Sequence, residues 1–135
     1  MTLVDTNILI DILSRDPMWG ARSLARFGER AAIGPMLIVD VIYAECATTF
    51  ASAEHLSQAL EALQVERAAM SEHALWLAAQ AFRDYRKRGG VKTNVLPDFF
   101  IGAHASDAGI PLLTRDEGRY RTYFPEVELL EFFDE

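Results

Sequence analysis

The stretch Met1-Thr2-Leu3-Val4-Asp5-Thr6-Asn7 predicts a short strand that runs directly into a helix. The apolar residues that begin at Ile8 continue the helix, and Thr6 or Asn7 is a suitable N-cap for it. Asp5 therefore lies at the carboxyl edge of the strand, where open α/β sheets bind their ligands. No Lys or Arg lies near Asp5 in the sequence, so we interpret its carboxylate as a ligand for a cation.

The rest of the chain alternates between predicted helices and predicted strands. Helices are expected over residues 18–30, 40–50, 53–64, 71–85 and 97–109, and strands over residues 31–39, around 65, 110–114 and 127–133. A turn or short helix is expected over residues 117–124. Because no hairpin signal joins the strands, the pattern favours an α/β fold of three layers, a central, mostly parallel sheet with helices on both faces.

Helical spacing also predicts which faces are buried and where helices begin. Leu24 is expected to face the core from the helix over residues 18–30, and Leu75 from the helix that Ser71 caps. Pro97 fits the first position of the next helix, where its missing N–H is not needed.

Length and composition indicate one domain over residues 1–135. Half of the residues are apolar and 24% are charged, which is ordinary for a soluble globular protein. No apolar run approaches the roughly 20 residues of a membrane-spanning helix, and nothing at the N-terminus indicates a signal peptide. Cys46 is the only cysteine, which excludes an internal disulfide and fits a cytoplasmic protein with a buried thiol.

The formal net charge of −7 argues against a protein that simply coats nucleic acid. It does not exclude a nuclease. A site that gathers several carboxylates makes the protein more acidic, and a bound divalent cation reverses that charge locally.

Four acidic residues, far apart in the sequence, are expected to meet at one edge of the sheet. Asp5 and Asp116 each follow a strand, Asp98 opens a helix and Glu45 lies early in one. Strand ends and helix starts share one edge of a parallel sheet when the crossovers are right-handed. Carboxylates within about 6 Å of one another raise one another's pKa unless a cation neutralises them. Hard oxygen ligands without Cys or His favour Mg²⁺ or Mn²⁺ over Zn²⁺, and such an ion activates water against a phosphodiester.

The motifs around these acids resemble those of PIN-domain ribonucleases. They read Asp5-Thr6-Asn7, Ala44-Glu45, Pro97-Asp98-Phe99-Phe100-Ile101-Gly102-Ala103 and Leu112-Leu113-Thr114-Arg115-Asp116. The resemblance spans essentially the whole chain. Each motif alone is weak, whereas four in this order are specific. In its size the chain is similar to the VapC toxins of bacterial toxin–antitoxin pairs.

The resemblance implies a PIN-like endoribonuclease that depends on Mg²⁺, with Mn²⁺ as substitute. Such proteins are usually homodimers and are inhibited by a cognate antitoxin protein. The acidic, metal-holding residues of the family correspond by position to Asp5, Glu45, Asp98 and Asp116. Polar supporting groups of the family correspond to Thr6, Asn7 and Thr114. In such sites the metal holds a water for in-line attack on phosphorus.

Basic residues gather near the end of the helix predicted over residues 71–85. This basic cluster consists of Arg83, Arg86, Lys87, Arg88 and Lys92. It has two interpretations: a solvated helix end, where cations are favoured, or a patch that binds RNA phosphates. Arg115 is a second candidate for RNA contact.

Other charged residues are expected to lie outside the site. Asp11 and Asp40 are predicted to face solvent, and the three histidines have no mutual ligand spacing.

Two other classes of function remain open. An aspartate-based phosphotransfer enzyme also uses an acid at a strand end. However, Asn7 stands where a haloacid-dehalogenase-type phosphatase needs a second acid, and Thr114-Arg115 offers no lysine for a receiver domain. A PIN-like protein-binding module without catalysis is the other alternative, against which the intact acidic set argues.

Overall fold

A five-stranded, wholly parallel sheet forms the centre of the protein. The computed structural model describes residues 1–92 and 94–130. The strand order is β3-β2-β1-β4-β5. These strands span Thr2–Val4 (β1), Met36–Ile38 (β2), Val65–Arg67 (β3), Leu112–Leu113 (β4) and Leu129–Leu130 (β5).

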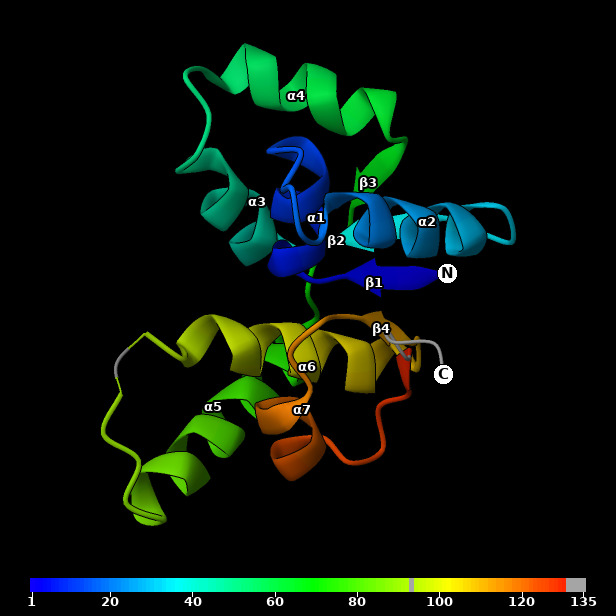
Figure 1. The fold of residues 1–135 in the computed structure, drawn as a ribbon. Coiled ribbons are helices and arrows are strands. Elements are labelled where there is room, and N and C mark those ends of the chain that lie inside the picture. The colour runs from blue at the N-terminus through cyan, green and yellow to red at the C-terminus, as the bar shows by residue number, and fades with distance from the viewer. Residues whose placement is uncertain (93, 131–135) are drawn as a thin grey trace.

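Helices cover both faces of this sheet (Figure 1). The first layer contains α1 (Thr6–Leu13), α2 (Gly20–Ala31), α3 (Asp40–Ala47) and α4 (Ala53–Ala62). The second contains α5 (Glu72–Lys87), α6 (Leu96–Ala108) and α7 (Gly118–Tyr123). The predicted α/β architecture of three layers is therefore confirmed, and the sheet is parallel at every described pairing.

The middle strand is buried on both sides, as parallel strands under two layers of helices are. Leu3 and Val4 of β1 have no exposed surface. Leu3 pairs in register with Leu37 on one side and with Leu112 on the other. This central position makes the end of β1 the natural meeting point for the segments that follow the neighbouring strands.

The chain reverses its direction of travel across the sheet beside β1. From β1 it moves outward through β2 to β3, then returns past β1 to β4 and β5. The connections that leave β1 and β4 consequently run in opposite layers, α1 in the first and α7 in the second. Ligands of open α/β sheets bind at such a switch point.

Small residues let the helices of the second layer pack closely. Ala74, Ala78 and Ala81 of α5 are buried, so α5 presents alanines to the core. Leu75 is 44% exposed, which makes the prediction that it faces the core wrong.

The buried face of α2 is also displaced from its predicted position. Leu24 is 50% exposed, whereas Ser23 and Phe27 are buried. Ser23 tolerates burial because its hydroxyl donates a hydrogen bond to Asp11 at 2.7 Å. Apolar spacing alone could not predict a core-facing serine.

The predicted helix ends are mostly confirmed. The Ser71 hydroxyl accepts a hydrogen bond from the N–H of Ala74 and caps α5. Gly109 ends α6 with φ +66°, a conformation that favours glycine. Pro97 is the second residue of α6 rather than the first. Of the strand predicted over residues 127–133, the structure has Leu129–Leu130, whereas residues 127 and 128 precede the strand. Residues 131–133 lie outside the described residues.

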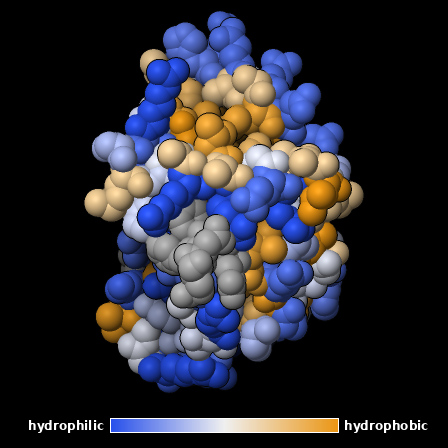
Figure 2. Space-filling model, turned by 45° about the vertical axis from the view of Figure 1, so that its right-hand side comes forward, coloured by the Kyte–Doolittle hydropathy of each residue, from blue (hydrophilic) through white to orange (hydrophobic). Residues whose placement is uncertain are grey.

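Apolar side chains also reach the surface in separate patches among hydrophilic ones (Figure 2). The large exposed apolar residues are Met1, Met18, Leu24, Ile33, Leu75, Trp76 and Val91. Among the described residues, no helix combines the length and the apolar character that crossing a bilayer requires.

Candidate active site

Asp5 links the end of β1 to the start of α1. Its side chain is the N-cap, with one carboxylate oxygen accepting from the N–H of Thr6 at 2.7 Å. The expectation that Thr6 or Asn7 caps this helix is therefore wrong by one residue. The other oxygen accepts from the hydroxyls of Thr114 (2.7 Å) and Tyr120 (2.9 Å). Asp5 thus accepts from uncharged donors in three places: the residue that follows β4, helix α7 and the start of its own helix.

Burial and hydrogen bonding act in opposite directions on the Asp5 carboxylate. The residue is only 5% exposed, and this burial raises its pKa from 3.8 to about 6. The hydrogen bonds from Thr114, Tyr120 and Thr6 lower the pKa, whereas the negative charge of Asp98 raises it further. Because desolvation prevails, a nearby cation would be favourable for this carboxylate.

Asp98 reaches the same region from the first turn of α6. Its carboxylate forms an ion pair with the guanidinium of Arg119 on α7. Burial raises the pKa of Asp98, and the charge of Asp116 acts in the same direction, while Arg119 lowers it. The carboxylates of Asp5, Asp98 and Asp116 therefore interact electrostatically across the end of the sheet.

Glu45 approaches from α3, in the opposite helical layer. It accepts a hydrogen bond from the Thr6 hydroxyl at 2.6 Å, so Thr6 joins Glu45 to the segment that carries Asp5. Cys46 is buried, as expected, and burial together with the charges of Glu45 and Asp5 raises the pKa of its thiol to about 11. This thiol stays protonated and is not a nucleophile at neutral pH.

Thr114 and Asn7 tie the end of β4 to α1. The Thr114 hydroxyl accepts from the side-chain amide of Asn7 at 3.3 Å and from the N–H of Asp116 at 3.0 Å. The Asn7 carbonyl oxygen accepts from the N–H of Arg115 at 3.3 Å. These bonds hold the backbone of Asp116 at the switch point, while its side chain remains exposed.

The four predicted acids share one region without forming a ready set of ligands. Within residues 1–92 and 94–130, no three Asp, Glu, His or Cys side chains lie close enough together to hold a metal ion. The donor chemistry nevertheless fits a hard cation, because every nearby acid offers carboxylate oxygen and the acids repel one another.

The chain matches the PIN domain family over residues 2–125. The chain belongs to the PIN-domain family.

Solved structures share the fold of this PIN domain at low sequence identity. One is VapBC2 from Rickettsia felis bound to a DNA fragment from its promoter, with a TM-score of 0.72, 16% identity and 96% of each chain covered. VapBC-1 from nontypeable Haemophilus influenzae has a TM-score of 0.72, 19% identity and 97% of each chain covered. FitAcB from Neisseria gonorrhoeae has a TM-score of 0.65, 21% identity and 98% of each chain covered. No curated protein matches the chain in sequence.

Arg115 of the PIN domain has a structural partner. Its guanidinium donates two hydrogen bonds to Asp11, at 2.6 and 2.9 Å, and lies 4.7 Å from the centre of the Trp19 ring. Asp11 is 4% exposed, so the prediction that it faces solvent is wrong. Asp40 is exposed, as predicted, and pairs with Arg67.

The side chains of the basic cluster are exposed, as both of its interpretations require. Arg88 pairs with Asp84 at 3.0 Å and lies over the ring of Tyr123, and Arg86 lies over the ring of Phe82. The end of α5 and the start of α6 lie on the same side of the PIN domain, at the left of Figure 1. This placement leaves both interpretations open.

Sequence reasoning missed two residues of the site, Arg119 and Tyr120. Both belong to α7, and Tyr120 is 2% exposed. Burial and the charges of Asp5 and Asp98 raise the pKa of Tyr120, so its hydroxyl remains a hydrogen-bond donor. In the sequence, a tyrosine between two arginines indicates an exposed helical turn, not a buried residue. Only the packing of α7 against α6 reveals its role.

Proposed function

We propose that this PIN domain is a divalent-metal-dependent endoribonuclease and the toxin of a toxin–antitoxin pair. The observation that carries the proposal is the electrostatic coupling of Asp5, Asp98 and Asp116 at the switch point beside β1. The charge of Asp98 raises the pKa of Asp5, and the charge of Asp116 raises the pKa of Asp98. Such repulsion is unfavourable for stability alone, whereas it suits a site that binds a cation. Membership of the PIN-domain family supports the same activity.

Mg²⁺, or Mn²⁺ in its place, would be held by Asp5, Asp98, Asp116 and Glu45. PIN-domain nucleases generally use divalent metals. When bound, such an ion supplies an activated water and neutralises charge on the phosphodiester.

The chain's own residues prepare this site by fixing its carboxylates. Thr114 and Tyr120 orient one oxygen of Asp5, and the helix N–H of Thr6 orients the other. We propose supporting roles for Thr6 and Asn7, and their hydrogen bonds to Glu45 and Thr114 support this proposal. The low exposure of Asp5 strengthens its interaction with a cation.

The proposed partners are RNA, an antitoxin protein and a second copy of the chain. Support for the antitoxin comes from the solved structures of similar fold, which are VapBC and FitAB-type complexes. RNA contacts are proposed for the basic cluster and for Arg115. We place this activity in the cytoplasm, within one domain over residues 1–135.

The phosphotransfer alternative gains no support from the contacts of Asp5. The hydrogen-bond partners of Asp5 are Thr6, Thr114 and Tyr120, and none of them is the second acid or the lysine that such an enzyme needs. A PIN-like binding module without catalysis is the alternative that the following experiment separates.

The test is RNA cleavage in Mg²⁺ by the wild-type chain and by Asp98→Asn. The variant removes a metal-holding charge at nearly constant shape, so we expect cleavage to fall by at least about 100-fold, in line with the loss of charge stabilisation at a reaction centre. Asp107→Asn is the matched control, because Asp107 is an exposed acid on the same helix. Circular dichroism verifies the fold of each variant. Equal cleavage by Asp98→Asn and wild type would remove Asp98 from the site, and no cleavage by any of them would favour the binding module.

A further inference from the structure

Arg119 places a positive charge directly on one of the proposed metal-holding acids. Its guanidinium pairs with the Asp98 carboxylate, and the two side chains are 23% and 30% exposed. The guanidinium carbon also lies 6.0 Å from the centre of the Tyr85 ring. The pair therefore lies at the rim of the site, partly shielded from solvent.

This contact differs from those of the other acids in the site. Asp5 and Glu45 accept hydrogen bonds from hydroxyl and amide groups, which carry no net charge. The neighbouring arginines have other partners, since Arg115 pairs with Asp11 and Arg121 pairs with Glu117. Among the ion pairs of the described residues, only that of Arg119 involves one of the four acids.

The ion pair of Arg119 and Asp98 offsets negative charge that the fold gathers at the site. The negative charge of Asp116 raises the pKa of Asp98, and the Asp98 side chain is 30% exposed. A half-buried carboxylate next to another needs a positive partner. A guanidinium supplies one positive charge through a long, flexible side chain, whereas a divalent ion supplies two at shorter range.

We propose that Arg119 is an internal counter-ion that occupies Asp98 in the metal-free protein and competes with the divalent cation for its carboxylate. The inference rests on the proposed function, because it assumes that Asp98 holds a metal ion. Metal binding then requires the guanidinium to leave Asp98, and Arg119 lowers the affinity for the metal. Asp5 needs no comparable exchange of charge, since its partners are neutral. Arg119 is in this sense a positioning residue that acts through Asp98.

The experiment measures Mn²⁺ binding by calorimetry to the wild-type chain and to Arg119→Gln. Loss of a charge-assisted contact should tighten Mn²⁺ binding by about tenfold. Arg119→Lys keeps a positive charge at this position and should bind Mn²⁺ within about threefold of wild type. Arg119→Met retains the aliphatic stem over Tyr85 and serves as a second neutral variant if Arg119→Gln does not fold.

Arg121→Gln is the matched control for net charge. Arg121 lies on the same helix, but its partner Glu117 is not one of the four acids. We expect this variant to bind Mn²⁺ as wild type does. Equal tightening by Arg121→Gln and Arg119→Gln would show a general charge effect and overturn the inference.

The outcomes also separate this inference from the proposed function. If the wild-type chain binds Mn²⁺ and the neutral Arg119 variants bind it no more tightly, the inference is wrong while the metal-dependent function stands. If neither wild type nor any variant binds Mn²⁺, both are wrong.

Discussion

The carboxylate of Asp5 accepts three hydrogen bonds, and its pKa nevertheless rises to about 6. Hydrogen bonds from neutral donors recover only part of the free energy that a carboxylate loses when it leaves water. The protein therefore keeps, at its centre, a charge that reduces its own stability. Such a residue is expected where a ligand with the opposite charge completes the environment.

This balance predicts how stability depends on pH. Between the ordinary value of 3.8 and about 6, Asp5 binds more protons in the folded protein than in the unfolded chain. The free energy of unfolding should therefore fall as the pH rises through this window, by on the order of 3 kcal/mol from this group. Asp98, with its raised pKa, contributes in the same direction. Urea denaturation in EDTA at a series of pH values measures the effect.

Asp5→Asn should remove most of this pH dependence, because the amide carries no charge. An exposed acid provides the control, and Asp40→Asn should leave the dependence as in wild type. A wild-type stability that stays constant or rises between pH 4 and 6 would contradict the assignment of a raised pKa to Asp5. Mn²⁺ should reduce the fall in the free energy of unfolding with rising pH, since the ion favours the charged carboxylate.

Tyr120→Phe tests the buried hydroxyl that contacts Asp5. The substitution removes a donor to a charged group at 2.9 Å and leaves the ring in place. We expect a loss of about 1.5–3 kcal/mol in the free energy of unfolding at neutral pH, and a smaller loss at pH 4, where Asp5 is protonated. Tyr123→Phe on the same helix is the control. Equal losses for both variants at both pH values would show that the hydroxyl of Tyr120 has no special relation to the carboxylate.

At the scale of elements, the contact between Asp11 and Arg115 joins α1 to the segment after β4. The two hydrogen bonds are short, and Asp11 is buried. Because Arg115 adjoins Asp116, the contact also fixes the segment that carries a proposed metal-holding acid. We therefore assign Arg115 a structural role, alongside the proposed RNA contact.

Arg115→Ala should destabilise the fold by about 3 kcal/mol, because it leaves the buried carboxylate of Asp11 without its cation. Arg67→Ala breaks the exposed pair with Asp40, and we expect a loss below about 1 kcal/mol from it. Urea denaturation of both variants gives the comparison. Similar losses would mean that the Asp11 pair is no more important than a surface pair.

Gly102 permits α6 and α7 to pack closely beside the site. A Cβ atom at this position would lie 2.3 Å from the Phe124 ring, and both residues are buried. The Gly102→Ala variant must therefore displace Phe124, which follows α7 directly. We expect a loss of about 1–3 kcal/mol in the free energy of unfolding, together with weaker Mn²⁺ binding as Tyr120 moves.

Gly28 is the control for helix propensity. It lies within α2, is exposed, and has open space around the Cβ position. Gly28→Ala should stabilise the protein by about 0.5–1 kcal/mol. A gain in stability for Gly102→Ala as well would contradict the close packing of α6 against Phe124.

At the scale of the whole molecule, the distribution of charge matters more than its sum. The chain carries a net charge of −7, and part of that negative charge is gathered at the end of the sheet. The RNA substrate of the proposed nuclease would have to approach this region although both are negatively charged. An exposed basic cluster at the end of α5 offers the attraction that the net charge does not.

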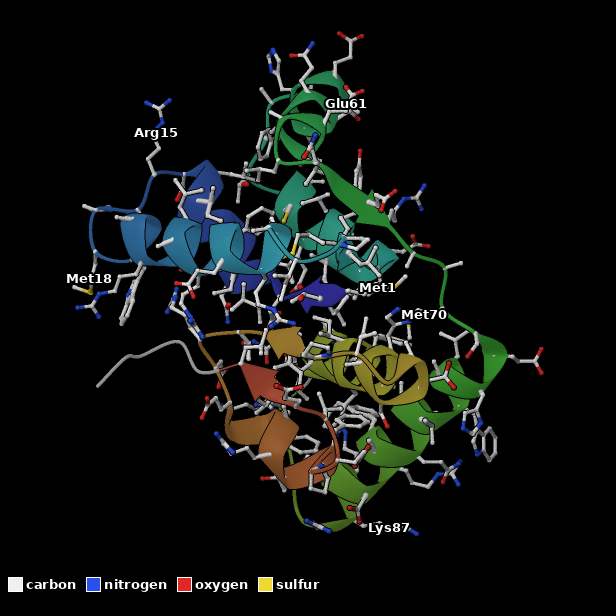
Figure 3. The ribbon with its side chains drawn as sticks, turned by 90° about the vertical axis from the view of Figure 1, so that its right-hand side faces the viewer. Met1, Arg15, Met18, Glu61, Met70 and Lys87 are labelled. Atoms are coloured by element: carbon white, nitrogen blue, oxygen red, sulfur yellow. The ribbon has the colours of Figure 1, made fainter. Side chains whose placement is uncertain are left out.

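The salt dependence of RNA binding tests this role of the cluster. Lys87→Gln, made in an Asp98→Asn background that does not cleave, should weaken binding to single-stranded RNA. We plot the logarithm of the association constant against the logarithm of the salt concentration. The negative slope of this plot should become less steep by about 0.7 for the lost phosphate contact. Arg15→Gln is the control, because Arg15 and Lys87 lie at opposite ends of the molecule (Figure 3). Equal effects of the two substitutions on RNA binding would favour the interpretation of the basic cluster as a solvated helix end.

The sequence alone determined the α/β class, the order of strands and helices, and the four acids that motif positions pick out. These follow from local rules, since apolar periodicity, caps and strand ends are properties of neighbouring residues. Asp5 was recognisable because a strand, an acid and a helix start adjoin within Met1–Ile8.

The tertiary structure decided which side chains contact one another. No rule based on neighbouring residues predicts these contacts. Ser23 is buried only because Asp11 accepts its hydrogen bond, and Asp11 is buried only because Arg115 reaches it from a distant segment. Tyr120 and Arg119 join the site because α7 packs on α6 across the switch point. Burial and electrostatic interaction act through space, so contacts between residues more than a hundred positions apart appear only when the chain is folded.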